Sequence, residues 1–346
     1  MNTTAGIIFS NLHDRHLTEL THKRTVGAIP FACRYRLVDF PISAMANSGI
    51  ENIYVIAHNN YRSLAEHIGS GKDYDLARHS GGIHILTPLM NAYALRREES
   101  YDSRLCALTS IIHTLEVAEE EYIIMCDCNS VYNIDFSDIV TYHSAGGYDL
   151  TLVAGIGDRS PFICAVRRKM LTEIIREALE KGLESFTGDI VKNNALCLKI
   201  GYYVTTEPFL TINSIGDYYS CNMEIIRNRE LRRHIFSDPL SPIFTRLHNP
   251  PPAKYSATAT VHNSLIADGC EIQGTVINSV IFRKVKIGKG AVISDSIVLE
   301  QTEIEDGANL RCVIADKGSI IKKQVMLVSD ESLPVYILPG KIVGQP

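Results

Sequence analysis

The feature that most restricts the fold of this chain is a six-residue repeat that begins after Ala257. Hydrophobic residues recur there at six-residue spacing, namely Ile266 and Ile272, then Ile281, Ile287 and Ile293, and then Ile304 and Leu310. Small or turn-forming residues lie between them, as in Ala267-Asp268-Gly269. This pattern predicts a short left-handed parallel β-helix whose apolar residues point into a three-sided prism. The end coils of such a stack expose unpaired strand edges and need a cap.

Residues 1–235 follow a different pattern, in which short apolar runs alternate with amphipathic segments. The runs predict buried strands at Ala5–Phe9, Asn52–Ala57, Tyr122–Cys126 and Asp149–Ala154. The amphipathic segments predict helices at Tyr61–Ile68, Leu105–Ala118 and Met170–Leu179. Alternating strands and helices favour a mostly parallel, Rossmann-like α/β sheet, which binds ligands at the carboxyl ends of its strands.

Residues 236–256 separate the two patterns. Five of the 13 prolines lie there, at Pro239, Pro242, Pro250, Pro251 and Pro252. Such a composition is typical of an extended linker or strap. We therefore expect an α/β domain over residues 1–235, a linker over residues 236–256, and a β-helix domain with a C-terminal tail over residues 257–346.

Composition excludes several classes of function. The formal net charge is −5, whereas a nucleic-acid-binding protein usually carries a basic surplus. No apolar run approaches the roughly 20 residues that span a membrane, and no secretory signal is expected at the N-terminus. The nine cysteines are an odd number in scattered positions, which favours reduced thiols in a cytoplasmic protein. Cys126 and Cys128 alone are too few to predict a metal site.

Three segments carry a resemblance to a known family. They are Arg34-Tyr35-Arg36-Leu37-Val38-Asp39-Phe40-Pro41 with the following Asn47-Ser48-Gly49-Ile50, Tyr218-Tyr219-x-x-Asn222-Met223-Glu224, and Asn278-Ser279-Val280-Ile281-Phe282. Over nearly its whole length the chain resembles ADP-glucose pyrophosphorylases, which transfer an adenylyl group from ATP to glucose 1-phosphate in bacterial glycogen synthesis. The resemblance implies a nucleotidyltransferase sheet followed by the β-helix.

The resemblance fails at the phosphate-binding loop. Family members carry G-G-x-G-x-R-L, whose backbone amides hold the phosphates of ATP. This chain has Asn11-Leu-His-Asp-Arg-His-Leu17, which contains no glycine. The family's loop arginine aligns with His16. The lysine and proline of its R-A-K-P motif align with Val26 and Gly27.

The resemblance also predicts that the metal-binding carboxylates are lost. In the family they hold the Mg²⁺ ion that neutralises the triphosphate. One aligns with Asn129, and counting back from Asn222-Met223 places the other at Thr211. Both side chains are uncharged. Asp127 is a candidate substitute, because a two-residue slip of a strand keeps a side chain on the same face.

The sugar-phosphate site is missing as well. The family's long segment ending in F-x-E-K-P is reduced to about ten residues between Ala154 and Cys164, without E-K-P. The family's G-T-A-D-A stretch is absent from Ser103–Ser110. We therefore expect no catalytic residue, no metal site and no cofactor in this chain, whereas the catalytic homologue would use Mg²⁺.

Three basic residues match family positions that bind a sugar-bisphosphate activator. They are Lys23, Arg24 and Arg36, and three clustered cations suit a phosphate ligand. The alternative is a solvated basic patch or structural ion pairs with Asp39 or Glu19. The residues alone leave open whether these cations bind an effector or form a basic patch or ion pairs.

The leading hypothesis is a regulatory subunit that has little or no activity and pairs with a catalytic homologue in a hetero-oligomer, a tetramer by family resemblance. A divergent active nucleotidyltransferase using Asp127 is the alternative. A third candidate is a binding protein that uses the emptied cleft. A hexapeptide acyltransferase is disfavoured, because His262 is the only histidine in the repeats and is expected to be structural. Tyr202-Tyr203 and Tyr218-Tyr219 are expected to pack the sheet and its covering helix.

Overall fold

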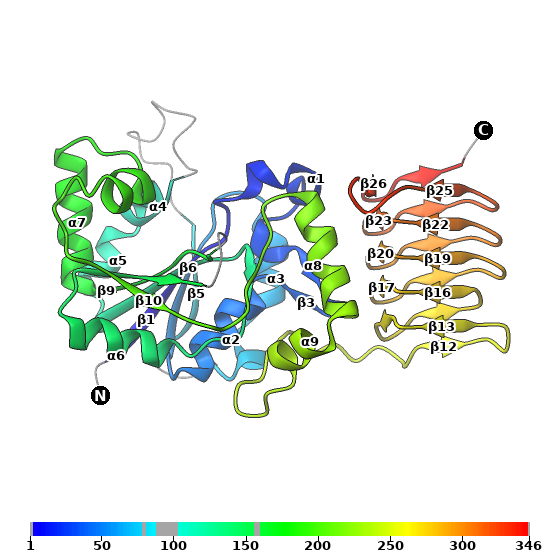
Figure 1. The fold of residues 1–346 in the computed structure, drawn as a ribbon, viewed down its shortest axis with the longest axis horizontal. Coiled ribbons are helices and arrows are strands. Elements are labelled where there is room, and N and C mark those ends of the chain that lie inside the picture. Colours follow the sequence, from blue (N-terminus) through cyan, green and yellow to red (C-terminus); the bar gives the residue numbers. More distant parts are fainter. Residues whose placement is uncertain (1–2, 78–80, 88–102, 156–159, 345–346) are drawn as a thin grey trace. The chain divides into compact units, whose positions relative to one another are not determined.

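The structure is a computed structural model that describes residues 3–77, 81–87, 103–155 and 160–344. Spatial contacts divide the chain into two compact units, each built from segments that are not contiguous (Figure 1). The first unit comprises Met1–Ile29, Leu37–Thr211 and Asp238–Arg246. The second comprises Pro30–Arg36, Ile212–Ser237 and Leu247–Pro346.

A seven-stranded sheet forms the centre of the first unit. In spatial order its strands are β10 (Ile200–Val204), β8 (Leu150–Ala154), β9 (Ile163–Arg167), β6 (Tyr122–Asp127), β1 (Thr4–Phe9), β4 (Asn52–Ile56) and β5 (Gly82–Leu86). Only β9 runs antiparallel to its neighbours, β6 and β8. The predicted mostly parallel α/β sheet is confirmed. Two short strands, β7 (Ser130–Val131) and β11 (Leu210–Thr211), pair beside it.

Helices cover the sheet of the first unit. They are α1 (Thr18–Thr21), α2 (Asp39–Asn47), α3 (Arg62–Ile68), α4 (Arg104–Ser110), α5 (Ile112–Val117), α6 (Phe136–Gly146) and α7 (Arg168–Glu180), with short turns at Asp14–His16, Val26–Ala28, Lys72–Tyr74 and Phe186–Lys192. The predicted single helix over Leu105–Ala118 is instead two helices. The Thr109 and Ser110 hydroxyls bond back to the carbonyls of Leu105 and Ala107 where the helix breaks, a contact that bends helices.

Helix α6 buries one histidine against the sheet. His143 is fully buried, its Nδ1 lies 2.9 Å from Thr151 Oγ1, and its ring packs edge-on against Tyr122. No described residue makes a hydrogen bond to its Nε2. Burial, reinforced by the charge of Arg167, lowers the pKa of His143 from 6.5 to about 4. The folded protein therefore holds this imidazole neutral.

The buried imidazole predicts a pH dependence of stability. Between pH 6.5 and 4 the unfolded chain takes up a proton at this histidine that the folded chain refuses. The free energy of unfolding should therefore fall by about 3 kcal/mol from this group as the pH drops through that window. His143→Asn should lose less stability than the natural chain between pH 7 and 4 in urea unfolding. Parallel curves for the two proteins would contradict the assignment.

The repeats form a three-sided parallel β-helix in the second unit, as predicted. One side is β12 (Lys254–Tyr255), β15 (Glu271–Ile272), β18 (Lys286–Ile287), β21 (Glu303–Ile304), β24 (Ile320–Ile321) and β27 (Ile342–Val343). The next is β13 (Thr260–His262), β16 (Thr275–Ile277), β19 (Val292–Ser294), β22 (Asn309–Arg311) and β25 (Met326–Val328). The third is β14 (Leu265–Ile266), β17 (Val280–Ile281), β20 (Ile297–Val298), β23 (Val313–Ala315) and β26 (Val335–Ile337).

The repeat residues fill the interior of this prism. Ile272, Ile287 and Ile304 are each 1% exposed and lie in register on one side. The first coil begins at Lys254, three residues before the expected domain boundary at residue 257. His262, the histidine that a hexapeptide acyltransferase would need and that is expected to be structural, lies exposed on the edge strand β13.

The second unit also contains elements that sequence places in the α/β domain. They are the hairpin of β2 (Pro30–Phe31) and β3 (Tyr35–Arg36), and the helices α8 (Ile215–Arg227) and α9 (Arg229–Phe236). Asn222 Oδ1 of α8 accepts a hydrogen bond from the Ala32 amide, and Tyr218 Oη donates to the Pro30 carbonyl. The hairpin is therefore bound to α8, and the unit boundary differs from the change in sequence periodicity.

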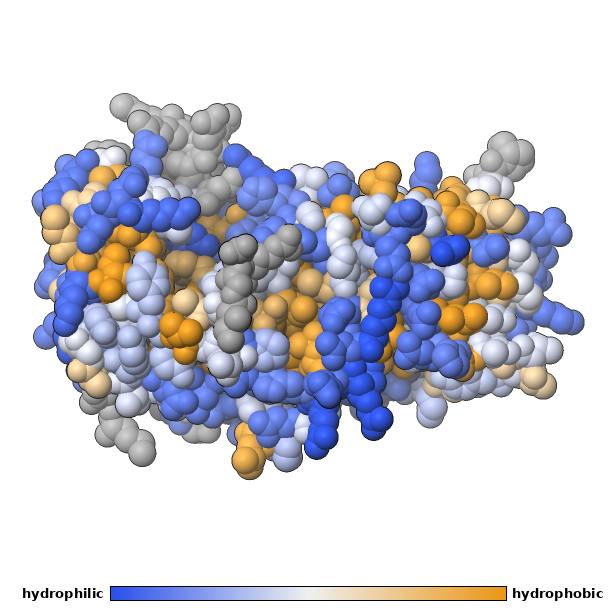
Figure 2. Space-filling model, viewed as in Figure 1, coloured by the Kyte–Doolittle hydropathy of each residue, from blue (hydrophilic) through white to orange (hydrophobic). Residues whose placement is uncertain are grey.

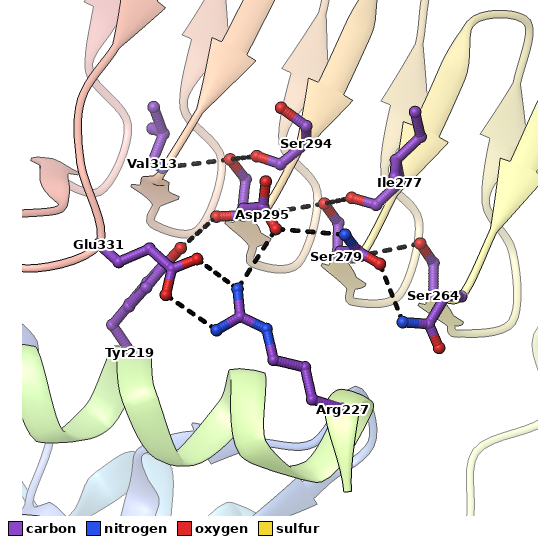
Figure 3. Close-up of polar contacts among 12 residues, drawn as sticks. Tyr219, Arg227, Ser264, Ile277, Ser279, Ser294, Asp295, Val313 and Glu331 are labelled. Atoms are coloured by element: carbon purple, nitrogen blue, oxygen red, sulfur yellow. Dashed lines mark hydrogen bonds and ion pairs between the residues drawn. The ribbon is translucent and has the colours of Figure 1, made fainter.

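Helix α8 binds a corner of the β-helix through polar contacts (Figure 3). Arg227 makes a two-pronged ion pair with Glu331, and its guanidinium lies 3.4 Å from Asp295 Oδ1. Tyr219 Oη donates to the Asp295 carbonyl at 2.6 Å. Burial and this environment raise the pKa of Tyr219. The helix therefore packs against the prism as part of the same unit.

A ladder of serines builds that corner from coil to coil (Figure 3). The hydroxyls of Ser264, Ser279 and Ser296 each donate to the carbonyl two residues earlier, at 2.7 to 2.8 Å. Each also accepts the backbone N–H of the next coil at 3.1 Å. The ladder therefore satisfies backbone groups at a turn that strand pairing leaves open.

The proline-rich strap begins at Phe236, the last residue of α9, and has no helix from Ser237 to Ser256. Its residues Asp238–Arg246 belong to the first unit, where Asn133 Nδ2 donates to the Ser241 carbonyl at 2.8 Å and the Phe244 amide donates to Ser43 Oγ at 2.8 Å.

Among the described residues, none of the helices combines the length and the hydropathy needed to cross a membrane.

Candidate functional site

The candidate site lies at the carboxyl ends of the central strands of the first unit. Asp127 ends β6 and is in register with Phe9, the last residue of β1. The loop that follows β1 contains the stretch Asn11–Leu17, where a phosphate-binding loop would lie. Parallel sheets bind ligands at this edge.

Two side chains hold Asp127 at this edge. It is 3% exposed, and His13 Nε2 donates to its Oδ2 at 2.8 Å. Arg104 bonds to both carboxylate oxygens, with Nε 3.1 Å from Oδ1 and a second bond to Oδ2. Arg104 also donates to Thr187 Oγ1 at 2.8 Å and lies 3.9 Å from the centre of the Phe162 ring. The carboxylate is thus paired by two side chains of this chain.

This pairing decides the protonation of Asp127. Burial raises the pKa of the carboxyl, but the Arg104 charge and the His13 hydrogen bond outweigh burial, and the pKa is lowered overall. Asp127 is therefore an anion at neutral pH with a cation of the protein bound to it. A metal ion approaching the same oxygens would have to displace Arg104. This geometry disfavours Asp127 as a substitute metal ligand.

The structure brings together the two positions predicted to have lost their carboxylates. Thr211 in β11 pairs directly with Ser130 in β7, and Ser130 Oγ lies 3.3 Å from Thr211 Oγ1. Asn129 precedes Ser130 and is 4% exposed. A divalent cation prefers several anionic oxygens, which two uncharged side chains do not provide. Across the described residues, no cluster of three or more His, Cys, Asp or Glu side chains is arranged to hold a metal ion.

The loop after β1 is closed by its own hydrogen bonds. Asn11 Nδ2 donates to Asp14 Oδ2 at 2.5 Å, and Asn11 Oδ1 accepts the His58 amide at 3.1 Å. The other oxygen of Asp14 accepts the amide of Val26 at 2.9 Å. Val26 is buried, whereas His16 is exposed. Neither is an arginine or a lysine, the residues that the resemblance places at these two positions.

A small cavity lies beneath the loop that follows β1. It is lined by Phe9, Asn11, Leu12, His58 and Ala107 and has a volume of about 10 Å³, which is room for about one water molecule. The Leu12 side chain packs against the hydrophobic core beneath it. Leucine therefore occupies space at a position where the resemblance places a glycine.

A much larger groove lies at the opposite, amino-terminal edge of the same sheet. Its volume is about 920 Å³, and Thr3, Asn52, Glu120 and Ser144 contribute to its lining. Sequence analysis marked no functional residue there. Nothing in its lining resembles a phosphate site, because its charged residues are the glutamates Glu51, Glu119 and Glu120.

The predicted effector residues have different surroundings. Lys23 is exposed and Arg24 is buried, and both belong to the first unit. Arg36 is half-buried in β3, opposite Pro30, in the second unit. The convergence of these three cations on one phosphate stays a prediction.

Sequence analysis missed the two partners of Asp127. Arg104 opens helix α4 and His13 lies in the altered loop, and 90 residues of sequence separate them. The pairing became visible only when the fold placed both beside β6. The one available signal was that an aspartate at the end of a buried apolar run needs a counter-charge from elsewhere in the chain.

Two family models match the chain. A nucleotidyl transferase model covers residues 6–161, and a model for the GlmU-like C-terminal hexapeptide covers residues 251–333.

Curated relatives match over both regions. The glycogen biosynthesis protein GlgD of Bacillus subtilis (strain 168) is 31% identical over 344 residues, which cover 99% of this chain and 98% of that protein. The GlgD protein of Geobacillus stearothermophilus is 33% identical over 293 residues, covering 84% and 83%. A glucose-1-phosphate adenylyltransferase of Fervidobacterium nodosum is 28% identical over 364 residues, covering 90% and 86%.

Proposed function

Because this chain belongs to the family of the glycogen biosynthesis protein GlgD, we propose that it is a regulatory subunit of glucose-1-phosphate adenylyltransferase. In this proposal it has little or no activity itself and modulates a catalytic homologue that makes ADP-glucose from ATP and glucose 1-phosphate. The homologue supplies the Mg²⁺ site. The complex is a cytoplasmic hetero-oligomer, a tetramer by family resemblance.

The observation that carries the proposal is the paired carboxylate at Asp127. Adenylyl transfer needs a divalent cation and phosphate-binding donors at the carboxyl edge of the sheet. Here Arg104 and His13 hold the carboxylate, and uncharged side chains occupy the two neighbouring metal positions. The fold that a catalytic partner would recognise is retained. A chain that keeps the fold but lacks the charged groups for adenylyl transfer is better suited to regulating an enzyme than to catalysing the reaction.

The regulation would act through the equilibrium between states of the complex. A partner that binds two conformations of the catalytic subunit with different affinity shifts that equilibrium. An effector held by Lys23, Arg24 and Arg36 would shift it through the same coupling. A hexose bisphosphate is the effector class we propose, because three cations match its two phosphates.

The proposal predicts the outcome of a pyrophosphate-release assay with ATP, glucose 1-phosphate and Mg²⁺. This chain alone should show no turnover. Mixed with its catalytic homologue, it should change kcat/KM or the response to a hexose bisphosphate by about five-fold or more. Lys23→Ala should reduce the bisphosphate response, whereas the control Lys181→Ala, on the exposed end of α7, should not.

Two results would overturn the proposal. One is an unchanged rate and effector response of the homologue in the mixture. The other is turnover by this chain alone that Asp127→Asn abolishes, which would establish the alternative of a divergent enzyme using Asp127.

A further inference from the structure

The groove at the amino-terminal edge of the sheet in the first unit has the size of a ligand site. Its volume of about 920 Å³ falls within the range of small-molecule sites, about 300–1,000 Å³. It is lined by the first residues of β1 and β4, by the segments that follow α2 and α5, and by one side of α6. The site around Asp127 lies at the other edge of the sheet, so the proposed regulatory role leaves this groove without a function.

The charged residues that line the groove are all carboxylates. They are Glu51, Glu119 and Glu120, and no lysine, arginine or histidine belongs to the lining among the described residues. Arg168 donates to the backbone carbonyls of Leu115 and Glu120 and is not part of the lining. A negative lining without a cation favours a positively charged ligand.

Asn52 adds a buried acceptor that has no partner. Its Nδ2 donates to Glu120 Oε1 and to Tyr54 Oη, each at 2.9 Å. These two bonds fix the orientation of the amide, because a carboxylate accepts from the nitrogen and repels the oxygen. Asn52 Oδ1 is buried, and no described residue makes a hydrogen bond to it. Such an oxygen destabilises the protein until a donor reaches it.

Three hydroxyl groups in the lining use their hydrogen atoms within the protein. Ser48 Oγ donates to the Ala44 carbonyl at 2.7 Å. Thr141 Oγ1 donates to the Ser137 carbonyl at 2.8 Å, and Ser144 Oγ donates to the Thr141 carbonyl at 3.0 Å. These oxygens therefore offer lone pairs to a ligand. Together with the carboxylates they give the groove a lining rich in acceptors, which a ligand rich in N–H donors matches.

The carboxylates are spread across the groove. Glu51 lies just before β4, and Glu119 and Glu120 lie just before β6. Strands β4 and β6 flank β1 on opposite sides, so their starts are about 10 Å apart. Carboxylates at that separation suit a ligand that carries positive charges at more than one point of a chain.

Helix α6 contributes a hydrophilic rim with apolar surface beside it. Ser137 and Thr141 are exposed on this helix. Figure 2 shows mostly hydrophilic side chains where Figure 1 labels α6. Val140 and Val117 add apolar surface to the lining. Methylene groups can lie against these valines while charged groups stay near the carboxylates.

Hydrogen bonds hold the walls of the groove in place. Ser48 Oγ accepts the Phe136 amide at 2.8 Å and so joins the end of α2 to the start of α6. On the other side of α6, Tyr142 Oη donates to the Tyr202 carbonyl at 3.1 Å. The expectation that Tyr202 packs within the sheet is wrong, since more than half of it is exposed. Walls fixed in this way reduce the cost of ordering a site when a ligand binds.

We propose that this groove binds a linear aliphatic polyamine. Its ammonium groups are bound by Glu119, Glu120 and Asn52 Oδ1, and its methylene segments lie against Val117 and Val140. A primary ammonium group has three N–H donors and no acceptor, which matches the lining. The site is independent of the proposed regulatory role. An unchanged rate of the catalytic homologue would leave it standing, and loss of polyamine binding would not decide the function.

The first test is isothermal titration calorimetry of the full chain with spermidine at about 0.15 M salt. Spermidine should bind with a dissociation constant below about 1 mM. Its affinity should fall as salt is added, because salt screens the carboxylates. The control ligand is 1,8-octanediol, which has a similar length and no charge and should not bind. Equal binding of the two ligands, or no binding of spermidine, would overturn the proposal.

A charge-removing variant locates the site. Glu120→Gln keeps the shape of the side chain and should raise the dissociation constant for spermidine about ten-fold. The matched control is Glu177→Gln, because Glu177 is exposed on α7 of the same unit, where it pairs with Lys181. This control should bind spermidine as the natural chain does. If Glu120→Gln also binds with unchanged affinity, spermidine is held elsewhere and the proposal fails.

A second pair of variants leaves the contact between Asn52 and Glu120 intact. Thr141→Lys adds an ammonium group of the protein to the groove and should raise the dissociation constant for spermidine about ten-fold or more. Thr141→Gln adds length without charge and should change it less than about three-fold. Thermal unfolding confirms that both variants are folded. Equal affinity of the two Thr141 variants for spermidine would overturn the assignment of this groove.

Discussion

Replacing Arg104 by alanine is expected to lower the free energy of unfolding of the first unit by about 3–5 kcal/mol. Asp127 is 3% exposed, and Arg104 supplies its counter-charge through two nitrogen atoms. Without the guanidinium the carboxylate stays buried, and His13 is its remaining side-chain partner among the described residues. Urea unfolding at pH 7 measures the loss. The control is Arg62→Ala, which removes a 91% exposed arginine paired with Glu66 and should cost less than about 1 kcal/mol.

A second substitution separates the charge from the packing. Asp127→Asn removes the buried anion, so Arg104→Ala should cost much less in that background than in the natural chain. The pH dependence follows the same logic. In the Arg104→Ala variant the pKa of Asp127 should rise. The loss in free energy of unfolding relative to the natural chain should then shrink as the pH falls, because the carboxyl becomes neutral. If Arg104→Ala lowers the free energy of unfolding no more than Arg62→Ala does, the ion pair between Arg104 and Asp127 does not stabilise the site.

Replacing Ile293 by alanine is expected to destabilise the second unit by about 2–5 kcal/mol. Ile293 lies in the middle of β19, is fully buried, and pairs with Val276 and Leu310 on neighbouring coils. The smaller side chain leaves a cavity that rigid stacked coils cannot close. Thermal unfolding followed by circular dichroism measures the effect.

The neighbouring residue provides a matched control for this prediction. Val292 precedes Ile293 in the same strand but points outward and is 37% exposed. Val292→Ala should therefore cost about 0.5 kcal/mol or less. The difference between the two alanines isolates interior packing from strand propensity. Equal losses at the two positions would show that the prism interior is not where the repeat gains its stability.

Much of the architecture could be read from local patterns in the sequence. The spacing of Ile281, Ile287 and Ile293 predicts the prism because each coil repeats the same in-and-out geometry, and all three are buried. The strands of the sheet follow from runs such as Tyr122–Cys126, which matches β6. The two positions where the resemblance places lost carboxylates, Asn129 and Thr211, lie close together, because Thr211 pairs with Ser130, the residue after Asn129.

Other features required contacts between distant parts of the chain. Helix α8 lies within the predicted α/β region of the sequence, yet Tyr219 and Arg227 bind it to the β-helix. The break between α4 and α5 depends on how Thr109 and Ser110 use their hydroxyls. Hydrophobic periodicity predicts neither the packing partner of α8 nor the break between α4 and α5. A helix with one apolar face can pack on either neighbour.

The sequence by itself determined that this chain would have a nucleotidyltransferase sheet and a β-helix, and its resemblance predicts the loss of the family's phosphate-binding and metal-binding residues. Only the tertiary structure decided which side chains surround Asp127. His13 and Arg104 meet Asp127 because the sheet brings residues 13, 104 and 127 to one edge. The physical reason is that repeat spacing and strand pattern are local properties, whereas neutralising a buried charge depends on which distant side chains reach it.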